Sequence, residues 1–141
     1  MALSTDLEIL NRVLRDLSSC FVQYVGDCWP WTSISSDGDK LQAVVSQCVA
    51  RQRQSIERIA EHLASRQSRV EYGRFSTEFT DLHYVSLQFL VKQLAAAQTR
   101  LVESLDRTVT MLPSGDEARE VLEAVRHSEL ENLTALQACC S

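Results

Sequence analysis

The sequence predicts an all-α protein: one domain over residues 1–141 in which four helices form an antiparallel, up-down-up-down four-helix bundle. In four segments, apolar side chains recur every three or four residues, the spacing that places them on one face of a helix. The chain has only 4 Gly and 2 Pro, whereas β-rich folds need more of these residues in their turns. The connections between the segments are short, which makes neighbouring helices antiparallel.

The first helix is predicted over residues 5–25. Thr5 and Glu8 have the spacing of a capping box, in which each side chain bonds a free backbone N–H of the first turn. Gly26 is expected to end the helix. The apolar stripe comprises Leu3, Leu7, Leu10, Leu14, Leu17, Phe21 and Val25.

A loop over residues 27–37 follows and contains both tryptophans of the chain, Trp29 and Trp31, on either side of Pro30. Large aromatic rings in such a loop can close the open end of a bundle and bury much apolar area. They can also anchor a partner protein, because Trp is common at interface hot spots. The first interpretation is favoured.

The second helix is predicted over residues 39–70, with its stripe at Leu41, Val45, Cys48, Gln52, Ile56, Ile59 and Leu63. A turn around Tyr72-Gly73-Arg74 leads to the third helix, residues 78–112, which Ser76 or Thr77 caps and Pro113 stops. Its stripe is His83, Leu87, Leu90, Leu94, Ala97 and Leu101.

The fourth helix is predicted to run to residue 137, and Ser114 and Glu117 have the spacing of a second capping box. Its stripe is Ala118, Leu122, Val125, Glu129, Leu133 and Leu136.

A bundle of this length resembles the ferritin-like superfamily, and the segment from Glu78 to Leu90 is similar to uncharacterised bacterial ferritin-like domains. The resemblance implies a di-iron site built from one carboxylate on each of two helices and a Glu-x-x-His pair on each of the other two. The first helix offers no inward carboxylate. The others offer Gln52 with Ser55, Ser86 with Gln93, and Glu129 with Asn132. We therefore expect no di-iron centre, no other metal and no cofactor.

These six residues, Gln52, Ser55, Ser86, Gln93, Glu129 and Asn132, form a predicted polar layer inside the bundle. Buried polar groups must bond one another or water. The favoured interpretation is a network that holds the helices in register; the alternative is a site for a small polar ligand. His83, on the apolar stripe, is interpreted as a hydrogen-bonded core residue, with a metal ligand as the alternative.

The second helix also carries a basic stripe beside its apolar one. We interpret it as a solvated face paired with acids of a neighbouring helix, such as Glu103, Asp106 or Glu120; the alternative is a surface for an acidic partner or a phosphate. The stripe comprises Arg51, Arg58, His62, Arg66 and Arg69.

The five cysteines contain no Cys-x-x-Cys pair, so neither a disulfide framework nor a zinc site is indicated. Cys20 and Cys48 are expected to be buried inside helices, and Cys139 and Cys140 to be frayed and reactive.

Charge and hydropathy narrow the function further. The formal net charge of −5 argues against a nucleic-acid-binding protein, and no apolar run approaches a membrane span. The first residues lack the pattern of a signal peptide, so a cytoplasmic protein is expected.

No catalytic motif is present, and we expect a protein that acts through protein–protein contact. A homodimer through the third or second helix is the expected form, with Phe89 as the residue that tests it. The alternatives are a di-iron-type oxidoreductase or metal-handling protein that uses Glu129 and His83, and a bundle that binds a small polar ligand.

Overall fold

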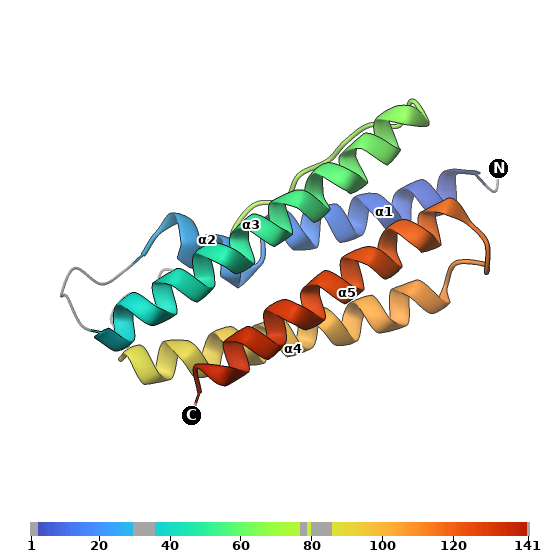
Figure 1. Ribbon diagram of the computed structural model, residues 1–141. Coiled ribbons are helices and arrows are strands. Elements are labelled where there is room, and N and C mark those ends of the chain that lie inside the picture. Colours follow the sequence, from blue (N-terminus) through green and yellow to red (C-terminus); the bar gives the residue numbers. More distant parts are fainter. Residues whose placement is uncertain (1–2, 30–35, 77–78, 80–85, 141) are drawn as a thin grey trace.

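The computed structural model describes residues 3–29, 36–76, 79 and 86–140. These residues form five α-helices and no strand, which confirms the all-α prediction for this part of the chain (Figure 1). The helices are α1 (Leu3–Ser18), α2 (Phe21–Asp27), α3 (Ser36–Ser65), α4 (Leu87–Thr110) and α5 (Glu117–Ala138). No helix among the described residues is long and apolar enough to cross a membrane.

Helix α3 runs antiparallel to α5, as contacts near the two ends of the pair show. The Arg51 guanidinium, midway along α3, donates to Asn132 late in α5 at 3.1 Å. Just beyond the C-terminal end of α3, Arg66 forms an ion pair of 2.8 Å with Glu117 in the first turn of α5. Positions therefore rise along α3 as they fall along α5.

Helix α4 is also antiparallel to α5, so α3 and α4 run in the same direction (Figure 1). Gln98 of α4 contacts Glu129 of α5, and Asp106, further along α4, pairs with Arg126 one turn earlier in α5. The predicted alternation of directions is wrong. The chain leaves the end of α3 and travels back along the molecule before α4 begins, which no short turn at residues 72–74 could achieve.

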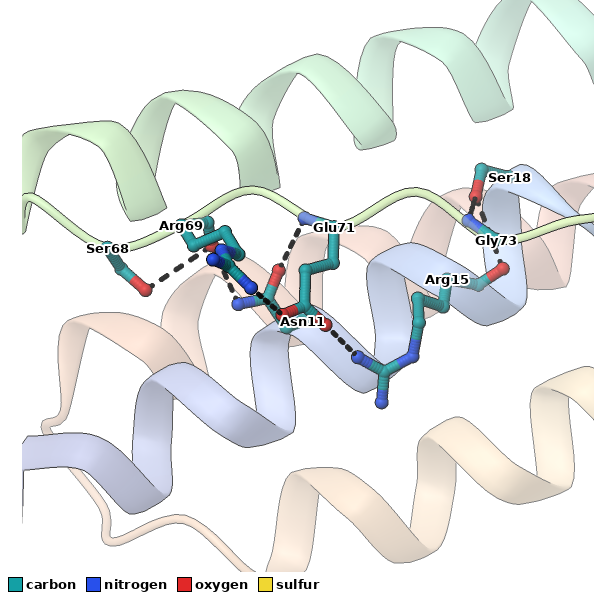
Figure 2. Close-up of polar contacts among 7 residues, drawn as sticks. All are labelled: Asn11, Arg15, Ser18, Ser68, Arg69, Glu71 and Gly73. Carbon is teal, nitrogen blue, oxygen red and sulfur yellow. Dashed lines mark hydrogen bonds and ion pairs between the residues drawn. The ribbon is translucent and has the colours of Figure 1, made fainter.

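Residues 68–76, here called the strap, form the first part of this return and lie in an irregular conformation alongside α1 (Figures 1 and 2). The Asn11 side chain of α1 bonds two of its backbone groups: Nδ2 donates to the Arg69 carbonyl at 2.8 Å, and Oδ1 accepts from the Glu71 N–H at 3.0 Å. Ser18 Oγ accepts from the Gly73 N–H at 2.8 Å. Side chains of α1 thus supply the hydrogen bonds that a helix or sheet would otherwise provide.

The predicted first helix is divided where the strap crosses it. α1 ends at Ser18, and α2 begins after Cys20, whose backbone is extended. The Ser19 hydroxyl donates to the Arg15 carbonyl at 2.6 Å. A Cβ at Gly73 would lie 2.5 Å from that same carbonyl oxygen, so only glycine lets the strap approach this closely.

Several predicted helix ends differ in the structure. Gly26 does not end a helix but lies within α2, where a Cβ would approach Val49 Cγ2 to 2.5 Å. Thr5 lies inside α1 rather than before it. Asp116 replaces Ser114 as the N-cap of α5, because its carboxylate accepts from the Ala118 N–H at 2.9 Å.

The turn that joins α3 to the strap places a non-glycine residue in the left-handed region. Gln67 has a φ of 58°, and bonds from Gln67 N–H to Ala64 O and from Ser68 N–H to Leu63 O close the helix end. This is the Schellman arrangement, in which glycine is the usual residue at the left-handed position.

Replacing Gln67 by glycine is expected to raise the free energy of unfolding by about 1 kcal/mol, because glycine adopts positive φ without steric cost. The matched control is Gln54→Gly at an exposed position within α3, where glycine should lower it by about 1 kcal/mol. Urea denaturation of both variants measures the two changes. Destabilisation by Gln67→Gly would contradict the strained turn.

The core consists of two apolar clusters at opposite ends of the helices. The first joins α1, the C-terminal halves of α3 and α4 and the N-terminal half of α5, with Leu10, Leu14, Leu63, Leu105 and Leu122 among its buried members. The second joins α2, the N-terminal halves of α3 and α4 and the end of α5, with Phe21, Val45, Cys48, Leu94 and Leu136 among its members. Between them the buried positions are polar.

Candidate functional site

The polar positions between the two apolar clusters form one layer of side chains, here called the central layer. It contains Gln23 from α2, Gln52 from α3, Gln98 from α4, and Glu129 and Asn132 from α5. All five are buried, and Gln52, Glu129 and Asn132 are completely inaccessible to solvent. Four helices therefore contribute to one internal polar site.

Glu129 is at the centre of this layer. Its Oε2 accepts hydrogen bonds from three amides: Gln98 Nε2 at 2.5 Å, Gln52 Nε2 at 3.1 Å and Asn132 Nδ2 at 3.2 Å. Gln98 Nε2 also donates to the backbone carbonyl of Glu129 at 3.0 Å. The other carboxyl oxygen, Oε1, is buried without a hydrogen-bond partner among the described residues.

Two opposing effects act on the proton of Glu129. Burial raises the pKa of this carboxyl above its ordinary value, because an ionised group loses the solvation of water. The bonds from Gln98, Gln52 and Asn132 favour the ionised form and lower the pKa, but by less than burial raises it. The net pKa is raised, so the neutral acid is favoured more in the fold than in water.

Gln52 connects the Glu129 carboxyl to Gln23 of α2. Its Nε2 faces Glu129, while its Oε1 accepts from Gln23 Nε2 at 2.9 Å and from the Cys20 thiol at 3.3 Å. Gln23 Nε2 also donates to the Val49 carbonyl at 3.3 Å. The amide of Gln52 is thus oriented by bonds at both ends.

Arg51 borders the layer on the solvent side. Its guanidinium donates to Asn132 Oδ1 at 3.1 Å and lies 3.8 Å from the Glu131 carboxylate. Asn132 in turn donates to Glu129 Oε2. The cation therefore reaches the buried carboxyl only through the intervening amide, and it orients Asn132 so that its nitrogen faces Glu129.

Two cysteines adjoin the layer, and both favour the protonated thiol. Burial raises the pKa of Cys20 to about 12 and that of Cys48 to about 11. Cys48 is buried as expected, and Cys20 is half-buried. Cys139 was expected to be frayed, but it is half-buried against the second cluster, and burial raises the pKa of its thiol as well. A nucleophilic thiolate is not favoured at these three positions.

Four residues of the predicted polar layer are buried: Gln52, Ser55, Glu129 and Asn132. The structure brings three of them into direct contact, with Ser55 one turn along α3 from Gln52. The placement of Ser86 in the layer is wrong, because this residue is the exposed N-cap of α4 and accepts from the Phe89 N–H at 3.2 Å. Gln93 is only half-buried and is not part of the central layer. His83 lies outside the described residues.

Gln98 and Gln23 were missed from the sequence. Gln98 follows the buried Leu94 by four residues, and the stripe of α4 continues through Gln98 and Val102 rather than through Ala97 and Leu101. Both continuations suit a helix, so spacing alone did not distinguish them. Gln23 was missed because all five residues from Phe21 to Val25 are buried in α2, so the buried surface of this short helix is not confined to one face.

The basic stripe does not form one continuous helix face, because α3 ends at Ser65 and Arg69 lies in the strap. Arg51 pairs with α5, Arg66 pairs with Glu117, and Arg69 lies 3.9 Å from Glu71. Arg58 is exposed. The expected acidic partners on a neighbouring helix do exist, but they are Glu131 and Glu117 rather than Glu103, Asp106 or Glu120.

Trp29 is half-buried and packs against the second apolar cluster, in agreement with the closing role expected for this loop. Trp31 lies outside the described residues. The role of either tryptophan in binding a partner stays a prediction.

The central layer supplies one carboxylate and several amides. The amide oxygens of Gln52 and Asn132 are already acceptors within the layer, and the groups that face Glu129 are N–H donors, which do not bind cations. Among the described residues there is no cluster of three or more histidine, cysteine, aspartate or glutamate side chains suited to a metal ion. The donor set therefore suits a hydrogen-bonded carboxyl better than a di-iron centre.

No protein-family model, no curated protein and no solved structure matches this chain.

Proposed function

We propose that this protein is a ferritin-like four-helix bundle in which the central layer occupies the place of a di-iron centre, and that it acts in the cytoplasm through protein–protein contact. The proposed partner is a second copy of the chain. The observation that carries the proposal is the saturation of Glu129 Oε2 by amides from α3, α4 and α5.

A carboxyl with these hydrogen bonds has a structural role. Each amide would lose a buried hydrogen bond if its helix slid along α5, and an unsatisfied buried donor costs about 1 to 3 kcal/mol. The layer therefore favours one register of the helices. Because the amides of the central layer are already bonded to Glu129, we expect the protein to bind its partner through its outer surface.

The outer surface of the described part retains four large apolar side chains: Tyr72, Phe75, Phe89 and Met111. Phe89 is 44% exposed in the first turn of α4. Aromatic side chains that remain exposed on a helix are often covered by a partner, and two-fold pairing of identical helices is the simplest way to cover them. These features support a homodimer through α4.

Light scattering at micromolar concentration is expected to give twice the chain mass of 15.9 kDa, and Phe89→Glu is expected to give a folded monomer. The change places a charge at the proposed contact without opening the core, so the helical content should not change. Gln88→Glu, at an exposed neighbouring position of α4, is the matched control and should remain dimeric. A wild-type mass of 15.9 kDa, or a dimer that survives Phe89→Glu, would reject this contact.

Protein purified without chelator is expected to carry no iron or manganese in stoichiometric amount, because the amides direct donors rather than acceptors at Glu129. Elemental analysis of the whole protein by mass spectrometry measures this content. Two metal ions per chain would favour the alternative, a metal-dependent oxidoreductase or metal-handling protein, and would overturn the proposed function.

A further inference from the structure

The contact between α1 and the strap has the form of a complex between a helix and an extended peptide. Asn11 bonds the backbone C=O of Arg69 and the backbone N–H of Glu71, and Ser18 bonds the N–H of Gly73 (Figure 2). The three bonded groups belong to alternate residues, as in pairing with a neighbouring strand. Backbone bonds of this kind hold a peptide in an extended form whatever its side chains are.

Three side chains and one glycine make the contact selective. Val70 packs partly buried against the first apolar cluster, and the Glu71 carboxylate accepts from Arg15 at 2.7 Å. At Gly73 a Cβ would lie 2.5 Å from a backbone oxygen of α1, so no larger residue fits. The Phe75 ring stands edge-on against Tyr24 of α2, with 5.3 Å between ring centroids. The surface therefore accepts the pattern Val-Glu-x-Gly-x-Phe.

The strap is joined to α3 through Gln67, the one non-glycine residue with a positive φ in the part of the chain that the structure describes. Gln67 has a φ of 58°, which glycine adopts freely and glutamine does not. Opening this turn would relieve the strain at Gln67. The α1 residues that hold the strap precede the turn in the chain, whereas the strap, α4 and α5 follow it. If the turn opens, the α1 of one copy can therefore bind the strap of a second copy, with α4 and α5 of that second copy following.

We propose that two copies of this chain exchange their straps, so that the Val-Glu-x-Gly-x-Phe segment of one copy, with α4 and α5 following it, binds α1 of the other. Every contact described above re-forms between the two copies, while the turn at Gln67 opens. Exchange of identical elements is a low-cost route to a dimer because it creates few new contacts. The exchange deepens the proposed association with a second copy, but it does not use the α4 surface at Phe89.

Charge reversal across the Arg15–Glu71 pair tests the exchange. In the Arg15→Glu chain a closed monomer places two carboxylates together, and in the Glu71→Arg chain it places two guanidinium groups together. When the two chains are mixed, an exchanged heterodimer matches opposite charges at both contacts. We expect mixing to raise the dimerisation constant on the order of tenfold over either variant alone, since two half-exposed pairs change from repulsion to attraction. The double variant with both changes in one chain should behave as the wild type.

The matched control is the ion pair of 3.3 Å between Arg53 of α3 and Asp27 of α2. Both residues precede Gln67, so exchange leaves them in the same copy. Mixing Arg53→Glu with Asp27→Arg should therefore give heterodimers only in the statistical proportion, with no rise in the dimerisation constant over that of either variant alone. The mixtures are unfolded, refolded together at equal concentration and separated by native mass spectrometry, which distinguishes heterodimers from homodimers by mass.

The turn supplies an independent test. The refolded Gln67→Gly variant should contain a several-fold smaller exchanged fraction than refolded wild-type protein, because glycine removes the strain that opening of the turn relieves. In refolded mixtures, which permit exchange, Phe89→Glu should leave the heterodimer of the charge-reversed chains intact, whereas the Phe89→Glu monomer expected above is protein that has not been unfolded. This difference separates the exchange from the α4 contact. Circular dichroism establishes that each variant is folded before mixing. Equal heterodimer yields from the Arg15–Glu71 and Arg53–Asp27 mixtures, or no heterodimer from folded charge-reversed chains, would overturn the exchange.

Discussion

Replacing Leu14 by alanine is expected to lower the free energy of unfolding by about 2 to 5 kcal/mol, because it removes a side chain from the middle of the first apolar cluster and leaves a cavity. Leu14 is completely buried on α1, between residues contributed by α3, α4 and α5. The four helices meet there, so the surroundings cannot collapse onto the smaller side chain without moving a backbone. Urea denaturation followed by circular dichroism measures the change.

The control for this change is Glu57→Ala at an exposed position of α3. It removes a side chain of similar length from a solvated surface and should cost under about 0.5 kcal/mol. Comparable losses at positions 14 and 57 would show that the buried face of α1 or of α3 is assigned to the wrong side.

Replacing Glu129 by glutamine is expected to remove much of the pH dependence of stability. The raised pKa of the folded-state carboxyl means that the fold binds this proton more tightly than the unfolded chain does. Its stabilising contribution is fully present below the unfolded pKa and is lost as the pH rises through the folded pKa. Each unit of difference between the two pKa values corresponds to about 1.4 kcal/mol.

Glutamine preserves the acceptor oxygen for the three amides but cannot ionise. The variant should therefore gain stability relative to the wild type as the pH rises above 4.5, the ordinary pKa of this carboxyl. Below that pH it should hold no advantage, because its own amide nitrogen meets no acceptor at the position of Oε1. The other carboxyls titrate equally in both proteins, so the difference between the two unfolding curves isolates Glu129. Parallel curves across this range would contradict the raised pKa.

The spacing of apolar residues was sufficient to predict that the chain is helical and to predict most of the buried helix faces. Leu10, Leu14 and Leu17 are buried as the stripe of α1 predicts, and so are Leu122 and Leu136 on α5. This information is local, because a helix repeats every 3.6 residues whatever it packs against. The same periodicity identified Gln52, Glu129 and Asn132 as inward-facing, since a polar residue at an apolar position is visible in the sequence itself.

Spacing could not determine where a stripe shifts or stops. After Leu94 the steps to Ala97 and to Gln98 are both consistent with a helix, and contact with Glu129 of α5 decides for Gln98. Likewise Arg69 and Val70 continue the apparent periodicity of α3, but the chain leaves the helix at Ser65. The energy that favours these outcomes comes from residues distant in the sequence.

The direction of α4 depended on tertiary structure alone. Asn11 and Glu71 are 60 residues apart, and their hydrogen bond helps to fix the path of the strap along α1. A strap of this kind needs only isolated side chains that satisfy its backbone and a glycine where it approaches a helix closely, and neither requirement produces a periodic pattern. The sequence by itself determined that the protein is helical and that Gln52, Ser55, Glu129 and Asn132 are buried. The return of the chain along α1, and with it the parallel course of α3 and α4, depended on hydrogen bonds between α1 side chains and the strap backbone, which only the folded molecule brings together.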